Sequence, residues 1–467
     1  MRLRLPKPVQ STRIAITGLS RSGKTVLLTT LAQHLLNWQR QNMPNFPKKA
    51  WAYPVRARLR ALPVGRRRFP YEENIALLRE SPPRWPQSTA DVSELHFDLS
   101  FRRTNREREP HGTWRKIHVE FVDYPGEWLT DLPLLTLSYA DWSTQVHAFA
   151  KEAPRKELAR EWLASFEKLS PDAPATPALA SRLTAAYRAY VQACRKRGLI
   201  YVQPGRLLQP GTNENNDLMM FCPLPASMSP PQTKRRSDGA PISLYDQFAA
   251  RYEEYKRTIV RPFVDNVFYG ANVQIVLLDL FNILNTGLYS YNDHRRCIED
   301  VIRAMHYGRP SWFVRNCVRP IFGGHSIENT IFVASKADHA TAPQHANLEK
   351  LLSDIVATAQ DEATGHTGTA RIANMIFSAI NCTKTIHTRE NGAYKSYLEG
   401  VIKDEEVKGT QTWDPGDVPD RFPDNGWDLG LYQFRDFAPV RVPLKHGATA
   451  PHINLDMLLG LMLESCL

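Results

Sequence analysis

One short loop constrains the fold of this chain more than any other feature. Residues 18–25 spell GLSRSGKT, which satisfies the pattern G-x-x-x-x-G-K-[ST] in full. The stretch before the loop alternates Ile14 and Ile16 as a short buried strand does, and the stretch after it consists of good helix formers. Glycines let successive backbone N–H groups turn toward an anion, and the next helix points its positive N-terminal dipole at the same place. The pattern predicts a phosphate-binding loop in an α/β fold.

The side chains of this loop have separate predicted tasks. Lys24 is expected to reach the β- and γ-phosphates of a nucleotide, and the Thr25 hydroxyl is expected to bind Mg²⁺. Arg21 is a candidate cation for hydrolysis, with a solvated loop side chain as the alternative. The residues of this loop that we expect to contact the nucleotide are Gly18, Ser22, Gly23, Lys24, Thr25 and Val26.

A second motif lies in VEFVDYPGEW, residues 119–128. Asp123 ends an apolar strand, where a carboxylate can hold Mg²⁺ through water. Gly126 completes D-x-x-G, and in switch proteins the N–H of that glycine contacts the γ-phosphate. The switch threonine that also binds Mg²⁺ is expected at Thr89, just upstream of the strand that starts near residue 94. Thr104, which follows that strand, is the alternative.

Glu127 directly follows the glycine of D-x-x-G. In Ras-like proteins a glutamine at this position orients the attacking water. A carboxylate can accept the same hydrogen bond, but its charge faces the γ-phosphate unfavourably unless a cation lies nearby. We therefore expect slow hydrolysis, or another residue that orients the water.

Two further motifs favour guanine over adenine. The sequence SKAD, residues 335–338, follows an apolar strand and resembles the [NT]-K-x-D motif, with serine in the first position. The Asp338 carboxylate can accept hydrogen bonds from N1–H and N2–H₂ of guanine, a pair of donors that adenine lacks. The stem of Lys336 is expected to pack along the purine, and Ser378 and Ala379 resemble the [ST]-A motif near guanine O6. A surface KAD without function is the alternative.

The order of the expected elements predicts one α/β domain that is interrupted once. Apolar runs near residues 273, 329 and 374 are separated by helical stretches, which is typical of a mostly parallel sheet. Residues 94–101 and 116–124 alternate strongly and are expected to pair antiparallel, whereas residues 47–63 are expected to form a proline-punctuated loop. The predicted domains are a discontinuous α/β unit at 1–126 and 262–467 and a mainly helical insertion at 127–261.

The composition of the chain indicates the cellular environment and the kinds of partner that we expect. The chain has 467 residues, and its six cysteines lack metal-like or CxxC spacing, which suits a reducing cytosol. No apolar run is long enough to cross a bilayer, so we expect a soluble protein. The net charge of +11 is clustered, with six arginines in residues 56–69. Such clusters are either solvated loops or contacts to anionic lipid or an acidic partner, and no RNP-type, zinc-finger or helix-turn-helix signature points to nucleic acid.

Six segments together resemble the YcjX-like family of bacterial P-loop proteins. They are ITGLSRSGKT, RWPQST, DYPGEWLTDLPLL, IVLLDLFNILNTG, SKADH and PHINLDMLLGLML, and they span nearly the whole chain. The resemblance implies a Ras-like GTPase core that carries an inserted helical domain. It also implies a stress-associated cytoplasmic protein, described as an ATPase although the motifs are those of a GTPase.

The motifs and the resemblance lead to one expected function with two alternatives. We expect a switch that binds GTP and GDP with Mg²⁺, hydrolyses GTP slowly and contacts a protein partner through the helical insertion. The first alternative is a P-loop ATPase. The second is a nucleotide-stabilised scaffold at a membrane surface, peripheral to the inner membrane, in which hydrolysis is incidental.

Overall fold

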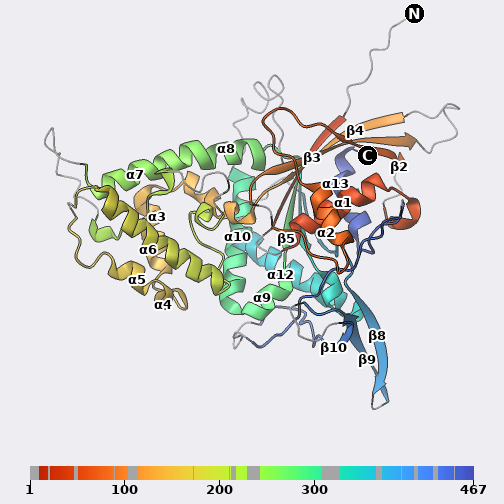
Figure 1. The fold of residues 1–467 in the computed structure, drawn as a ribbon. Coiled ribbons are helices and arrows are strands. Elements are labelled where there is room, and N and C mark those ends of the chain that lie inside the picture. Colours follow the sequence, from red (N-terminus) through yellow and green to blue (C-terminus); the bar gives the residue numbers. More distant parts are fainter. Residues whose placement is uncertain are drawn as a thin grey trace, which may run out of the picture.

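The structure is a computed structural model that describes most of the chain. It forms the predicted α/β architecture, in which helices flank a mostly parallel sheet (Figure 1). The described residues are 10–18, 22–46, 51–88, 90–103, 114–171, 173–209, 211, 217–228, 242–307, 327–363, 371–390, 392–403, 409–423, 427, 430–445 and 447–466.

The main sheet has seven strands in the order β2-β3-β4-β1-β5-β6-β7. β1 pairs in parallel with β4 and β5, and parallel pairing continues through β6 to β7. β3 pairs antiparallel with β2 and β4, which confirms the antiparallel pair predicted for β3 and β4. The strand bounds are β1 (Gln10–Gly18), β2 (Trp51–Arg60), β3 (Ser93–Arg103), β4 (Trp114–Asp123), β5 (Val273–Leu278), β6 (Asn329–Ala334) and β7 (Arg371–Ile376).

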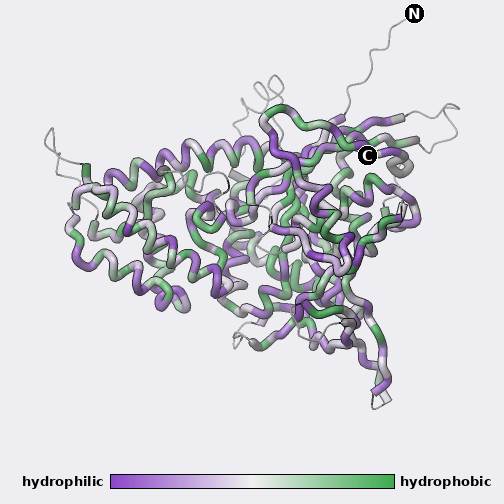
Figure 2. Tube along the Cα trace, in the orientation of Figure 1, coloured by the Kyte–Doolittle hydropathy of each residue, from purple (hydrophilic) through white to green (hydrophobic). Residues whose placement is uncertain are grey.

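The central strands are apolar because helices cover both faces of the sheet. Every residue of β5 is buried, as expected for a strand between two helical layers. One face is covered by α1 (Lys24–Leu36), α2 (Tyr71–Arg79) and α13 (Leu455–Met462). The other face is covered by α9 (Leu280–Thr286), α10 (Leu288–Tyr307) and α12 (His345–Ala363). Figure 2 shows hydrophobic residues along the central strands and mixed hydropathy on the outer helices.

Two β elements were not predicted. The loop prediction for residues 47–63 was wrong at residues 51–60, which form the edge strand β2. The register shifts on both sides of Pro54, and an edge strand with a bulge tolerates the missing N–H of proline. A second, antiparallel sheet projects from the body in Figure 1 and is made of β8 (Thr383–Glu390), β9 (Ala393–Gly400) and β10 (Gln411–Trp413).

The region after β4 is mostly helical and lies to one side of the sheet (Figure 1). A long helical run extends from Leu244 to Phe268 and includes two π-helical turns, η7 and η8. The bounds are η2 (Gly126–Leu135), α3 (Tyr139–Phe149), α4 (Arg155–Leu158), α5 (Arg160–Ala164), α6 (Pro177–Lys196), α7 (Leu244–Tyr255), η7 (Lys256–Val260), α8 (Arg261–Phe263) and η8 (Val264–Phe268).

The helical region shares a core with the sheet. Trp142 stacks on Tyr252 with ring centroids 5.0 Å apart, and both belong to a continuous cluster that also contains Ala15 and Val122 of the sheet. The predicted division into a discontinuous α/β domain and a helical insertion stays a prediction. None of the described helices combines the length and apolarity that crossing a bilayer requires.

Candidate functional site

The phosphate-binding loop connects β1 to α1 where β1 lies beside β5. Gly18 pairs with Leu277, and a Cβ at Gly18 would lie 2.6 Å from the Leu277 Cβ and 2.7 Å from its carbonyl oxygen. Only glycine fits this approach. Gly23 precedes α1 with a φ of 87°, in the left-handed region that glycine adopts without strain. Within the described residues no side chain caps α1, and its first turn has no acidic residue, so the N-terminus suits an anion.

Lys24 and Ser22 line the cavity that this loop borders. The Nζ atom of Lys24 donates a hydrogen bond to the Gly18 carbonyl, which folds the side chain back over the loop. The Ser22 side chain is buried, and its hydroxyl has no hydrogen-bond partner among the described residues. Polar atoms of this kind fit a ligand that supplies the missing acceptors.

A single cavity of about 330 Å³ joins the predicted phosphate and base residues. Its size is within the range of small-molecule sites. Three stretches that are far apart in the sequence meet here because the parallel strands β1, β6 and β7 end at the same edge of the sheet. The predicted residues that line it are Ser22, Gly23, Lys24, Thr25, Val26, Lys336, Asp338, Ser378 and Ala379.

Asp338 lies at the base end of this cavity in a network of donors. Its Oδ1 accepts from the Ser378 hydroxyl at 2.7 Å, and its Oδ2 accepts from the Cys382 N–H at 2.7 Å. The two motifs predicted to contact guanine are therefore bonded to each other. An ionised carboxylate has about four acceptor sites, so these bonds leave capacity for a ligand.

Lys336 is held between two carboxylates. Its φ of 61° is unusual for a residue other than glycine, and its Nζ lies 2.6 Å from Asp279 and 2.8 Å from Asp436. Burial opposes the charge, but the two carboxylates together raise the pKa of Lys336 above its usual value. Ser335, which replaces the usual Asn or Thr, donates to the Leu278 carbonyl at 3.2 Å.

Gly18 does not line the cavity, and neither do three further predicted residues, Asp123, Gly126 and Glu127. Asp123 is fully buried at the end of β4, in register with Ile16 of β1, so it lies at the same edge of the sheet as the loop. Gly126 begins η2. The Glu127 carboxylate lies 3.6 Å from Arg195 of α6. The roles assigned to these three residues stay predictions.

Three further positions fall on residues outside the described part of the chain: Arg21, Thr89 and the alternative Thr104. The segment before Thr89 is described, and its residues Trp85, Pro86 and Ser88 line the cavity.

Sequence reasoning gave no role to several residues that line the cavity, among them His339, Trp85, Lys403, Asp436 and Phe437. His339, next to the SKAD motif, stacks its ring on Phe281 with centroids 6.0 Å apart, and burial lowers the pKa of His339. Lys403, Asp436 and Phe437 come from segments that no local motif marks, whereas Trp85 lies in RWPQST, one of the segments that carry the family resemblance. Asp279, which pairs with Lys336, could have been found from the sequence, because it is an acidic residue at the end of an apolar strand, as Asp123 is.

The oxygen donors suit Mg²⁺ bound together with a nucleotide. Thr25 offers a hydroxyl in the cavity, and Asp123 offers a carboxylate at the adjoining strand end. Within the described residues no three His, Cys, Asp or Glu side chains cluster as a metal site. Such a sparse donor set fits Mg²⁺, which keeps several waters and uses substrate phosphates as ligands.

Comparisons with known proteins agree along the whole chain. The family model described as "YcjX-like family, DUF463" matches residues 12–467. A protein named Ras-like GTPase YcjX from Escherichia coli is 31% identical over 459 residues, which cover 97% of this chain and 95% of that protein. A protein of the same name from Shewanella oneidensis is 30% identical over 466 residues, covering 96% and 93%.

Proposed function

Because the chain belongs to the YcjX-like family, we propose that it is a GTP-binding P-loop protein that hydrolyses GTP slowly with Mg²⁺ and acts as a switch. Two relatives at about 30% identity carry the name Ras-like GTPase. The observation that carries the proposal is the shared cavity, in which residues 22–26 meet Asp338 and Ser378.

Guanine is the base that suits the donors and acceptors at Asp338. Its carboxylate is fixed by Ser378 and Cys382, so its remaining acceptor sites have a defined direction. Guanine presents two adjacent N–H donors to such a carboxylate, whereas adenine presents an unprotonated N1 beside a C–H. Adenine would leave the remaining acceptor sites of Asp338 unpaired and place its N1 lone pair toward them, which supports discrimination against adenine.

Slow hydrolysis is supported by the position of Glu127, which does not line the cavity where a water would attack the γ-phosphate. The Arg195 guanidinium lies 3.6 Å from this carboxylate and can offset its charge, so the support comes from the position of Glu127 and not from its charge. Lys24 and the N–H groups at the start of α1 would hold the phosphates. Bound Mg²⁺ would neutralise phosphate charge, with Thr25 and Thr89 as direct ligands and Asp123 through water. The role of Arg21 as a cation for hydrolysis is part of the same proposal.

A switch needs a path from the phosphates to a surface, and η2 offers one. It starts at Gly126, and its Thr130 hydroxyl donates to the Val202 carbonyl at 2.9 Å. Asp131 on the same helix accepts from Gly205 and Tyr255. A displacement of Gly126 would therefore move parts of the helical region, where we place the contact with a protein partner. The stress-related role implied by the family resemblance stays a prediction.

Nucleotide-dependent melting tests the base preference. A ligand that binds only the folded protein at 100 times its Kd stabilises it by about 2.7 kcal/mol. We expect GTP and GDP to raise the melting temperature, and ATP and ADP to leave it unchanged. Asp338→Asn should lose the response to GTP and gain one to XTP, because xanthine has a carbonyl where guanine has its amino group.

The control for this experiment is Asp420→Asn, which changes an exposed carboxyl. Since asparagine offers one acceptor in place of two to Ser378 and Cys382, the melting temperature of nucleotide-free Asp338→Asn must be measured as well. Equal stabilisation of the wild type by ATP and GTP would favour the ATPase alternative.

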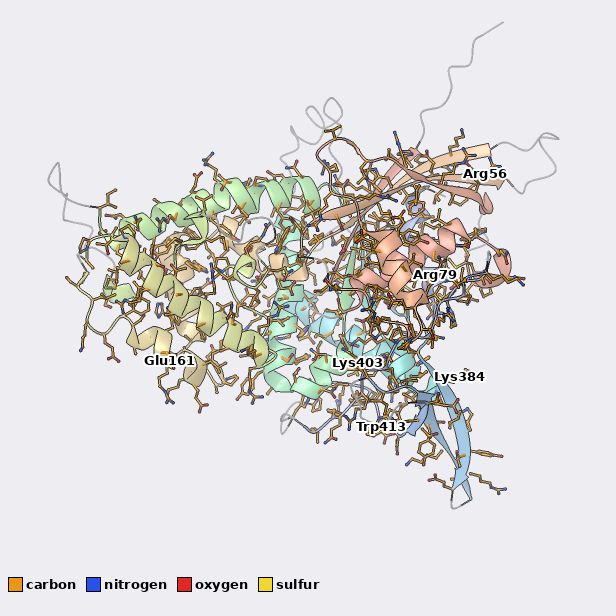
Figure 3. The ribbon with its side chains drawn as sticks, in the orientation of Figure 1. Arg56, Arg79, Glu161, Lys384, Lys403 and Trp413 are labelled. Carbon is orange, nitrogen blue, oxygen red and sulfur yellow. The ribbon has the colours of Figure 1, made fainter. Side chains whose placement is uncertain are left out.

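A peripheral contact with an anionic membrane is a second proposal, carried by β2. Arg56, Arg58 and Arg60 are all exposed and alternate along this edge strand, so they share one face (Arg56 is labelled in Figure 3). Ala57 and Leu59, which point to the other face, pack against the core. This arrangement suits attraction to anionic headgroups.

A further inference from the structure

A C-terminal segment, residues 434–442, crosses the base end of the cavity, and we call it the strap. Its first anchor is α9, where the Phe434 N–H donates to Asn285 Oδ1 at 2.9 Å and the Asn285 amide donates to the Phe434 carbonyl at 2.8 Å. The Phe434 ring also packs on Phe281, with centroids 4.9 Å apart. The strap is thus fixed to the helix that follows Asp279.

The second anchor is the chain just after β9. The Ala438 N–H donates to the Val401 carbonyl at 2.7 Å, and the Lys403 N–H donates to the Asp436 carbonyl at 2.8 Å. Phe437 forms an antiparallel bridge with Ile402. Backbone pairing on this side holds the strap in a defined register.

The third anchor is the C-terminal end of α2. The Val442 N–H donates to the Leu78 carbonyl, and Nε of Arg441 donates to the Arg79 carbonyl, both at 2.9 Å. Figure 3 labels Lys403 of the second anchor and Arg79 of the third. The strap therefore bridges elements that the main sheet keeps apart.

Two strap residues face the cavity. Asp436 pairs with Lys336, and although burial opposes its charge, this lysine lowers the pKa of Asp436. Phe437 lines the cavity, and its carbonyl accepts a hydrogen bond of 3.0 Å from the indole N–H of Trp85. Trp85, in the segment between α2 and β3, also lines the cavity.

We propose that the strap retains the bound nucleotide and that the contact between Trp85 and Phe437 is a latch that must open for release. The inference rests on the proposed nucleotide site. The latch joins the strap to the segment between α2 and β3 by one hydrogen bond, while Asp436 holds the lysine that is expected to lie along the purine. Trp85, Asp436 and Phe437 are positioning residues, since they act on the nucleotide through the shape of its cavity.

The test measures how fast the protein releases GDP that carries a fluorescent methylanthraniloyl group, after addition of excess unlabelled GDP. Trp85→Phe removes the N–H donor and keeps an aromatic ring. Loss of one such bond should accelerate release by about 2- to 10-fold. Trp427→Phe is the matched control, because its indole N–H donates to the Leu284 carbonyl at the same distance of 3.0 Å, outside the cavity lining.

Asp436→Asn provides a second variant that does not depend on Trp85. It should also accelerate release, because asparagine holds Lys336 less strongly. The melting temperature of each nucleotide-free variant separates a general loss of stability from a specific effect on release. Faster release in Trp85→Phe and Asp436→Asn, with Trp427→Phe like the wild type, is the expected result.

Two outcomes would contradict the proposal, and they differ. If the wild type binds labelled GDP and all variants release it at the wild-type rate, the latch is wrong and the nucleotide site stands. If the wild type shows neither labelled-GDP binding nor nucleotide-dependent melting, the proposed function is wrong and the latch with it.

Discussion

Among single residues, Asp131 holds a carboxyl group where solvent does not reach it. It accepts from the Gly205 N–H at 2.7 Å and from the Tyr255 hydroxyl at 2.5 Å. Burial raises its pKa to about 6, although these hydrogen bonds and the nearby Arg206 oppose the rise. Asp131 belongs to η2, and its hydrogen bonds to Gly205 and Tyr255 attach this element to the helical region. Protonation of Asp131 would therefore change these bonds.

The raised pKa predicts how stability depends on pH. An aspartate in the unfolded chain has a pKa of about 3.9, so between pH 4 and 6 the folded state binds more protons than the unfolded state. The contribution of Asp131 is therefore greatest at low pH, and the free energy of unfolding falls by about 3 kcal/mol as pH rises through this window. Asp131→Asn removes the titrating group and should remove the contribution of Asp131 to this slope, although its single amide oxygen can accept from only one of the two donors, Gly205 and Tyr255.

Urea unfolding of wild type and Asp131→Asn, at half-unit steps from pH 4 to 7, measures the difference. Glu157→Gln, which changes an exposed carboxyl on α4, is the control and should leave the slope as it is. Equal slopes in Asp131→Asn and wild type would show that the buried carboxyl does not titrate in this range.

At the scale of elements, the parts of the fold and of the site that short continuous motifs encode could be predicted from the sequence. The strand, loop and helix around Gly23 follow from residue pattern alone, because the loop needs glycine and the strand needs alternating apolar residues. Asp338 and Ser378 were also predictable as partners in one site, since both follow apolar strands and parallel strands end at the same edge. The cavity brings these residues together.

Other elements could not be predicted because their contacts are distant in sequence. The strap has no periodic pattern, and its position comes from hydrogen bonds to α9, the end of β9 and α2. Trp85 could be noticed as a tryptophan in a polar loop, but its bond to Phe437 spans 352 positions. The strand β2 was mistaken for a loop because Pro54 breaks the usual pattern of a strand interior.

The arginine face of β2 leads to a prediction about membranes. Each arginine near an anionic surface contributes about 1 kcal/mol, so replacing Arg56, Arg58 and Arg60 by alanine should weaken vesicle binding about 100-fold. Arg58 lies opposite Asp98, which pairs with His118, so the face carries one compensating carboxylate. Co-sedimentation with vesicles rich in phosphatidylserine, across a salt series, measures the effect.

The matched control removes the same charge from the helical region, by alanine at Arg160, Lys168 and Arg182, which are all exposed. It should bind vesicles as the wild type does. Equal losses in both triple variants would mean that net charge, and not the face of β2, governs the attraction. No binding by the wild type would exclude the scaffold alternative.

At the scale of the whole molecule, the continuous core joins the helical region to the nucleotide site. Trp142 and Trp162 of the helical region belong to the same buried cluster as Val122 and Val276 of the sheet. The contact between the helical region and the sheet is part of the hydrophobic core. If either region lost its packing, apolar surface on the other would be exposed to water. Motion at Gly126 would reach this core through η2, whose buried residues belong to the same cluster as residues of the sheet and of the helical region.

The shared core predicts that the molecule unfolds as one unit, although its length would allow two. Scanning calorimetry should show a single transition, which excess GDP shifts as a whole. Trp142→Ala, in the helical region, should destabilise the protein by about 3–5 kcal/mol and lower the temperature of the same GDP-responsive transition. If two transitions appear and Trp142→Ala moves only the one that ignores GDP, the helical region folds by itself. In that case a switch would have to act through η2 alone, because the shared core would not transmit the change.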